Sequence, residues 1–93
     1  MSDIKITIMT PTYNRSSFLP KLYETLTKQT VDLTMMEWII VDDGSTDDTE
    51  DIVHKLKEKS PFGVNYIKST NRGKHHAVNM GIENATGEFF FIV

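Results

Sequence analysis

The stretch that decides the fold is Trp38-Ile39-Ile40-Val41-Asp42-Asp43-Gly44-Ser45. Its first four residues are apolar and mostly β-branched, which predicts a strand buried on both faces, as in a parallel sheet. Because a buried strand has no room for charge, we expect Asp42 and Asp43 where this strand emerges, at its carboxyl end. In open α/β sheets that edge is where ligands bind.

Segments of alternating type surround this strand. The expected strands are residues 4–10, 38–41, 64–68 and 88–93, and the expected helices run from 16 to about 30, from 47 to about 59 and from 74 to 84. This β-α-β-α-β-α-β order predicts a mainly parallel sheet with helices on its faces and right-handed crossovers. We therefore expect an α/β, Rossmann-like three-layer sandwich in a single domain over residues 1–93, with strand 64–68 at an edge.

Local signals set the expected ends of these elements. Pro11 should end the first strand, because proline cannot donate to the hydrogen-bond ladder. Ser16 should cap the first helix. Asp47 and Glu50 have the spacing of a capping box for the second helix. Gly87 should end the third helix as a left-handed cap.

Composition narrows the function classes. The chain has 93 residues, 25% of them charged, and a formal net charge of −3, which suits one globular domain with a small core. The absence of cysteine excludes disulfides and thiolate metal sites. Mild acidity argues against a nucleic-acid partner. No stretch has the length and polarity of a membrane span or signal peptide, so we expect a cytoplasmic protein.

The last five residues, Phe89-Phe90-Phe91-Ile92-Val93, are all apolar. A natural domain rarely ends in the middle of its core, so we expect the chain to be the N-terminal piece of a longer protein. The apolar surface left uncovered should then favour self-association of the fragment, through a sheet edge.

The loops at the carboxyl ends of the expected strands hold the residues with useful chemistry. These loops are residues 11–15, 42–46 and 69–74, and the opposite edge holds mostly turn residues. The polar and aromatic members of the first set are Tyr13, Asn14, Arg15, Asp42, Asp43, Arg72 and Lys74. This asymmetry predicts one ligand cleft that brings carboxylates, an aromatic ring and cations together.

Each group has both a binding role and a structural alternative. Tyr13 could stack on a planar ring, or be a half-buried loop aromatic. Asp42 could accept from an imide N–H or from sugar hydroxyls, or residues 42–45 could form a turn and cap. Arg72 and Lys74 could face phosphates beside a helix N-terminus, or be solvated surface charges. Together the binding roles indicate a nucleotide with a sugar or phosphate tail.

Five segments, in their order and approximate spacing, resemble family 2 glycosyltransferases. They are residues 8–15, 39–47, 71–74, 79–81 and 85–88, so the resemblance covers essentially the whole chain. It implies a GT-A fold, truncated here, and transfer of a sugar with inversion from a nucleotide-sugar donor to an acceptor. In that family this half of the domain binds the nucleotide.

The resemblance also implies roles for individual residues. Pro11, Thr12 and Tyr13 match the loop that lies along the base and ribose. Asp42 matches the carboxylate that accepts from the uracil N3–H, which implies a UDP-sugar donor. Cytosine offers an acceptor at that position, so a carboxylate would repel it.

The remaining matches lie in the following loops. Asp43 and Ser45 match the turn after the base-binding carboxylate, and Arg72 and Lys74 match a basic loop near the base and diphosphate. The family's metal-binding Asp-x-Asp motif would begin after Val93, and its general base further on. We therefore expect no catalytic residue in this fragment.

The parent protein and the fragment should differ in what they bind. The resemblance implies a divalent metal, Mg²⁺ or Mn²⁺, in the full-length parent and none bound to the fragment. It also implies a saccharide or lipid-linked acceptor for the parent, which could lie at the inner face of the membrane.

Two other classes remain as alternatives. A nucleotidyltransferase should carry a glycine-rich loop after the first strand, and residues 11–17 contain no glycine. A non-enzymatic receiver domain should have its acidic pair at the end of the first strand, whereas here the pair closes the second.

Overall fold

The computed structural model describes residues 4–30, 32–70 and 73–93. Its strands are β1 (Ile6–Thr12), β2 (Met36–Asp42), β3 (Gly63–Lys68) and β4 (Phe89–Ile92), and its helices are α1 (Phe18–Thr27), α2 (Thr49–Lys59) and α3 (Lys74–Asn84), with a 3-10 turn η1 (Leu33–Met35). The strands form one sheet in the order β3-β2-β1-β4, and neighbouring strands are parallel. The predicted α/β sandwich is therefore confirmed, with β3 at an edge.

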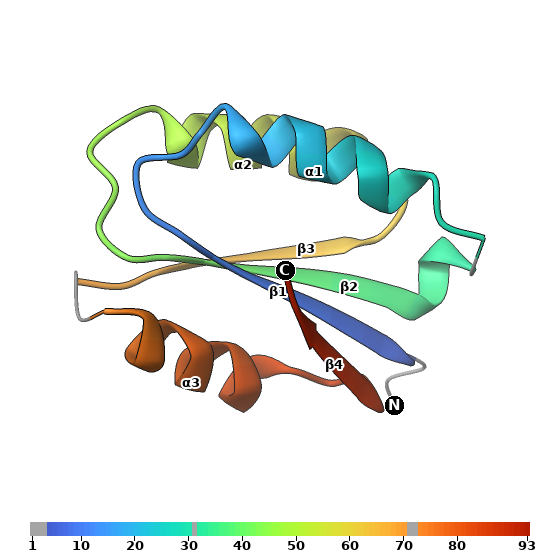
Figure 1. The fold of residues 1–93 in the computed structure, drawn as a ribbon. Coiled ribbons are helices and arrows are strands. Elements are labelled where there is room, and N and C mark those ends of the chain that lie inside the picture. Colours follow the sequence, from blue (N-terminus) through green and yellow to red (C-terminus); the bar gives the residue numbers. More distant parts are fainter. Residues whose placement is uncertain (1–3, 31, 71–72) are drawn as a thin grey trace.

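Helices cover both faces of the sheet. Helices α1 and α2 lie on one face and α3 on the other (Figure 1). Alternate residues of β2 serve these two layers: Trp38 and Ile40 pack toward α1 and α2, whereas Ile39 and Val41 pack toward α3. All four are 0% exposed. The apolar run is continuous because both faces of this strand are buried.

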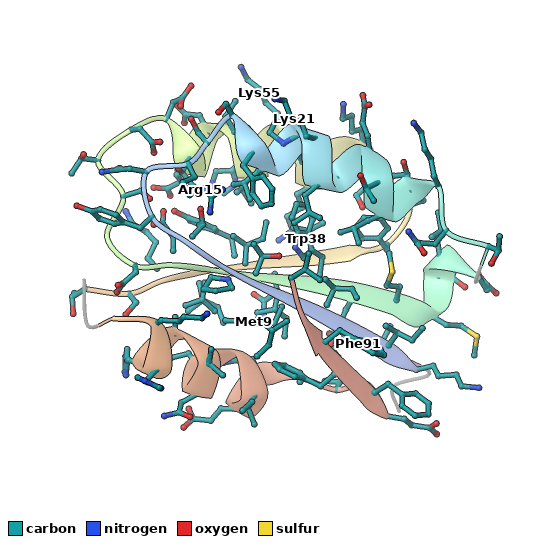
Figure 2. The ribbon with its side chains drawn as sticks, viewed as in Figure 1. Met9, Arg15, Lys21, Trp38, Lys55 and Phe91 are labelled. Atoms are coloured by element: carbon teal, nitrogen blue, oxygen red, sulfur yellow. The ribbon has the colours of Figure 1, made fainter. Side chains whose placement is uncertain are left out.

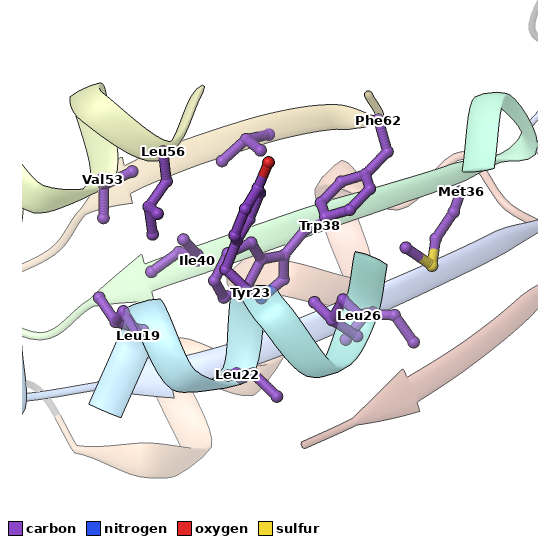
Figure 3. Packing of buried hydrophobic residues seen from close by; sticks show 12 residues of the cluster. Leu19, Leu22, Tyr23, Leu26, Met36, Trp38, Ile40, Val53, Leu56 and Phe62 are labelled. Atoms are coloured by element: carbon purple, nitrogen blue, oxygen red, sulfur yellow. The ribbon is translucent and has the colours of Figure 1, made fainter. Parts of the chain in front are cut away.

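The larger half of the core is centred on Trp38. Its ring lies 6.5 Å from that of Tyr23 and 6.4 Å from that of Phe62, centroid to centroid (Figure 3). The indole Nε1 donates to Thr10 Oγ1 at 2.9 Å, so the one polar atom of the buried ring is paired. This cluster fixes α1 and α2 on the sheet.

The smaller half of the core lies under α3. Ala77 and Gly81 are its buried helix residues, and both are small. A Cβ at Gly81 would meet the side chain of Met9, so a larger residue there would require that side chain to move. Figure 2 shows Met9 and Trp38 on opposite sides of the sheet.

The expected end of the first strand was wrong, since β1 continues through Pro11 to Thr12. The C=O groups of Lys5 and Met9 accept from β4, and that of Thr12 accepts from the residue after β2. Successive residues of a strand point their backbone groups to alternate sides. Pro11 is two residues after Met9, so its nitrogen points to the β4 side, as the backbone groups of Lys5 and Met9 do. There β4 ends level with Met9, so the missing N–H leaves the ladder with β2 intact.

Two predicted N-terminal caps were also wrong. Helix α1 begins at Phe18 without a side-chain cap, and the N–H of Ser16 donates instead to Asp47 Oδ2. Helix α2 begins at Thr49, because Asp47 Oδ1 accepts from the Thr49 N–H in a turn two residues long. Glu50 pairs with Lys68 across to β3, so it does not close a capping box.

The predicted left-handed cap at Gly87 was wrong as well. Helix α3 ends at Asn84, and Gly87 does not have a positive φ. A Cβ at Gly87 would lie 2.8 Å from the backbone nitrogen of Thr7. Glycine is required here because the chain entering β4 passes close to β1.

In the described part of the chain, no helix is long and apolar enough to cross a membrane.

Candidate functional site

An open pocket lies at the carboxyl edge of the sheet. The connections that leave β1 and β2 lie together there, next to the start of α3 (Figure 1). The pocket has a volume of about 330 Å³ and is lined by Pro11, Thr12, Tyr13, Arg15, Asp43, Lys74 and Ala77. The structure thus brings together five of the predicted binding residues. Arg72 lies outside the described residues.

The two adjacent carboxylates, Asp42 and Asp43, point to different faces of the sheet. Asp42 is the last residue of β2 and only 2% exposed. Its Oδ1 accepts from the Ser45 N–H at 2.9 Å, and its Oδ2 accepts from the Tyr66 hydroxyl on β3. Burial, and then this hydrogen bond to a carboxylate, raise the pKa of Tyr66 above its ordinary value. Asp42 therefore does not line the pocket.

Asp43 faces the α3 side, where the pocket lies. Its Oδ2 accepts from the Gly73 N–H at 3.0 Å, at the start of α3. Its own N–H donates to the Thr12 carbonyl at 2.9 Å, which joins the two strand ends. Successive side chains alternate between the faces of a sheet, so the Asp-Asp pair divides its carboxylates between them. Of the two carboxylates, Asp43 is therefore the one that lines the pocket.

Thr12 lines the pocket, and its side chain carries a buried hydroxyl that makes no hydrogen bond to the described residues. The residue is 5% exposed, and its Oγ1 has no hydrogen-bond partner among the residues that the structure describes. A buried polar atom without a partner costs about 1–3 kcal/mol, so such atoms are uncommon unless something else binds them. Thr12 stands level with Asp42 in the register, so its side chain lies on the same face of the sheet as that of Asp42, and the hydroxyl does not by itself indicate a ligand in the pocket.

Asn14 holds the two pocket loops together. Its φ is +51°, a left-handed conformation that asparagine tolerates better than most residues. Its N–H donates to Ser45 Oγ at 2.8 Å, and its Oδ1 accepts from the Thr46 N–H at 2.7 Å. The sequence placed Asn14 on this edge without a role. These reciprocal bonds fix the backbone beside Tyr13, on the first loop, and after Asp43, on the second.

Lys74 and Arg15 bring positive charge to the pocket. Lys74 is the first residue of α3, whose N-terminal N–H groups are free of intrahelical partners and favour anions. The Arg15 guanidinium lies over the Phe18 ring, 4.7 Å from its centroid, and also lines the pocket (Figure 2). The sequence placed Arg15 on this edge but did not indicate a specific role for it. Ala77 was not predicted as a lining residue, although a small residue in the first turn of a helix next to the site was a signal.

The described residues do not fit a metal site. Within these ranges, no group of three His, Cys, Asp or Glu side chains is placed to hold a metal ion. We therefore derive no metal-dependent step from this part of the chain.

Several curated proteins are similar to this chain. The poly(ribitol-phosphate) beta-N-acetylglucosaminyltransferase TarS of Staphylococcus aureus is 33% identical over 90 residues, which cover 97% of this chain and 16% of the relative. A GalNAc(5)-diNAcBac-PP-undecaprenol beta-1,3-glucosyltransferase of Campylobacter jejuni is 33% identical over 87 residues, which cover 91% of this chain and 27% of the relative. The chain thus spans only a minor part of the length of these relatives.

Solved structures with the same fold include two glycosyltransferases with bound donors or nucleotides. The mannosyltransferase PcManGT of Pyrobaculum calidifontis, in complex with GDP-Man and Mn²⁺, has a TM-score of 0.84 and 30% identity over 90% of this chain and 25% of that one. A 1–349 fragment of S. aureus TarS in complex with UDP has a TM-score of 0.83 and 33% identity over 97% and 27%. The α/β fold is therefore that of GT-A glycosyltransferases.

The nucleotidyltransferase and receiver alternatives are set aside by a match to one family over nearly the whole chain. The chain belongs to glycosyltransferase family 2, because the model of glycosyl transferase family 2 matches residues 7–93.

Proposed function

We propose that this chain binds the nucleotide of a nucleotide-sugar donor, with UDP as the nucleotide. The observation that supports it best is the pocket at the carboxyl edge of the sheet, which brings together an aromatic ring, a carboxylate and cations. The parent enzyme would transfer the sugar to an acceptor with inversion. In this proposal the described residues bind and orient the donor and do not carry out the transfer.

The pocket residues divide between the base and the diphosphate. Tyr13, which is about half exposed, would stack on the base, with Pro11 and Thr12 lining the pocket beside it. Asp43 would accept from the N3–H of uracil, because an ionised carboxylate can only accept. Lys74 and Arg15 would face the diphosphate, supported by the N-terminus of α3.

The similar proteins support the parts of this proposal that concern the rest of the enzyme. TarS has been solved with UDP and with UDP-GlcNAc, which favours a UDP-sugar donor. The names of two relatives specify a poly(ribitol-phosphate) and an undecaprenol-linked acceptor, so we propose a saccharide or lipid-linked acceptor. The Mn²⁺ in PcManGT favours Mg²⁺ or Mn²⁺ as the metal of the parent enzyme. We also propose a cytoplasmic site of action.

Titration calorimetry with UDP, CDP and GDP tests this function. The wild-type chain should prefer UDP to CDP by at least about tenfold, because the N3 acceptor of cytosine would meet the Asp43 carboxylate. Asp43→Asn should narrow that preference, since its amide can donate to cytosine as well as accept from uracil. Guanine also offers a donor at N1, so GDP is the informative comparison. Equal affinity for UDP and CDP, or preference for GDP over UDP, would contradict the proposal.

We propose as well that the fragment associates with a second copy of itself along β4. This edge strand exposes about half of each of Phe89, Phe91 and Ile92. Its outer edge also offers backbone groups that another strand can pair with. Light scattering should show an average mass that rises with concentration and is lowered by Phe91→Lys. A monomer at all concentrations would contradict this.

A further inference from the structure

The hydrogen bond between Tyr66 and Asp42 lies outside the pocket but acts on its geometry. We propose that Tyr66 is a positioning residue for recognition of the nucleotide base. Its hydroxyl holds the Asp42 carboxylate, and that carboxylate holds the turn on which Asp43 stands. This inference rests on the proposed function, in which Asp43 contacts the base.

A chain of hydrogen bonds connects the edge strand to both pocket loops. The Tyr66 hydroxyl donates to Asp42 Oδ2, and Asp42 Oδ1 accepts from the Ser45 N–H at 2.9 Å. Ser45 Oγ in turn accepts from the Asn14 N–H at 2.8 Å. Asp43 lies inside the turn that Asp42 and Ser45 close, and Asn14 lies between two pocket-lining residues. The conformation of both loops therefore depends on where the Asp42 carboxylate is held.

The Asp42 carboxylate depends on its two hydrogen-bond donors, the Ser45 N–H and the Tyr66 hydroxyl. It is almost fully buried, and a buried carboxylate is stable only when hydrogen bonds replace the water that it has lost. If the Tyr66 hydroxyl is removed, Oδ2 loses a charge-assisted bond and the carboxylate gains by turning toward solvent. Such a turn withdraws Oδ1 from the Ser45 N–H. The Asp43 side chain, one residue away, then loses its fixed direction.

The ring of Tyr66 is held independently of its hydroxyl. It packs against the core cluster beneath α1 and α2, and it meets the His54 ring edge-on at a centroid distance of 6.3 Å. Tyr66→Phe therefore removes the bond to Asp42 and keeps the packing. Tyr23→Phe is a matched control, since its hydroxyl donates to the Lys59 carbonyl, away from the pocket.

The experiment compares UDP and CDP binding by calorimetry in the wild type, Tyr66→Phe and Tyr23→Phe, with circular dichroism to confirm folding. Tyr66→Phe should weaken UDP binding by about fivefold or more and leave CDP binding nearly unchanged, so that the preference narrows. Tyr23→Phe should keep the wild-type preference. Asp42→Asn should resemble Tyr66→Phe, and the double variant should lose little more, because both changes break one link.

The outcomes separate this inference from the proposed function. If the wild type prefers UDP and Asp43→Asn narrows that preference, but Tyr66→Phe keeps it, the positioning role is overturned and the proposed function stands. An equal loss of UDP and CDP binding in Tyr66→Phe also overturns the role, since it indicates general destabilisation. If the wild type shows no preference for UDP, the proposed function is overturned, and this inference with it.

Discussion

Replacing Thr12 by valine should stabilise the protein and leave its nucleotide binding nearly unchanged. Valine has nearly the shape of threonine, and Thr12 Oγ1 makes no hydrogen bond to the described residues. Removing an unpaired buried hydroxyl should therefore gain about 1 kcal/mol of unfolding free energy. For a domain of this size, 1 kcal/mol raises the melting temperature by about 4–8 °C. The same change should leave UDP binding within about twofold of the wild type, because Thr12 stands level with Asp42 and its side chain lies on the face of the sheet opposite the pocket.

Thr10→Val is the matched control on the same strand. Thr10 is as deeply buried, but its Oγ1 accepts from Trp38 Nε1. Valine there leaves the indole N–H unpaired, so this variant should lose about 1–3 kcal/mol of unfolding free energy. Thermal unfolding followed by circular dichroism and calorimetry with UDP measure both effects. The reasoning is refuted if Thr12→Val destabilises the protein as Thr10→Val does, or if it weakens UDP binding by about fivefold or more.

Three further changes test the parts that hold the site. Gly87→Ala should cost about 1–3 kcal/mol of unfolding free energy, measured with urea, because its Cβ would meet the Thr7 backbone; an unchanged midpoint would contradict this. Asn14→Ala should destabilise more than Asn14→Gly, because only glycine keeps the left-handed backbone free of strain; equal midpoints would exclude strain. A hydrogen bond from the Thr49 hydroxyl holds the pKa of Asp47 below its usual range in the folded protein. The ionised Asp47 therefore stabilises the fold fully above the ordinary carboxyl pKa, and this stabilisation is lost as the pH falls through the lower pKa of the folded state. Melting temperatures of Asp47→Asn should accordingly depend less on pH between about 2 and 5, and an unaltered profile would count against that role.

The sequence predicted the layers of the fold because burial on two faces leaves a clear pattern. An unbroken apolar run such as residues 38–41 is typical of a strand at the centre of a sheet that helices cover on both sides. The helix at residues 74–84 was predicted with its observed bounds. Pro11 was misjudged because the side to which its nitrogen points depends on the register and length of β4, which a local pattern does not contain.

The edge that holds the site could be predicted, but not which carboxylate faces the pocket. Alternation along β2 requires Asp42 and Asp43 to face different sides. Which side carries the pocket depends on where α3 packs, and that is a tertiary property. The bonds from Tyr66 to Asp42 and from Asn14 to Thr46 join residues 24 and 32 positions apart, so no spacing rule indicated them.

The most direct test of the central claim is to map UDP binding on the ¹⁵N-labelled chain by NMR, since 93 residues give a resolvable amide spectrum. The account predicts that UDP shifts the amide signals of Thr12, Tyr13, Asp43 and Lys74 together, with one affinity. Signals from the apolar groove between α1 and β4, such as those of Leu22 and Phe91, should stay in place. No shifts at millimolar UDP, or shifts confined to that groove, would contradict the claim that the carboxyl edge of the sheet binds the nucleotide.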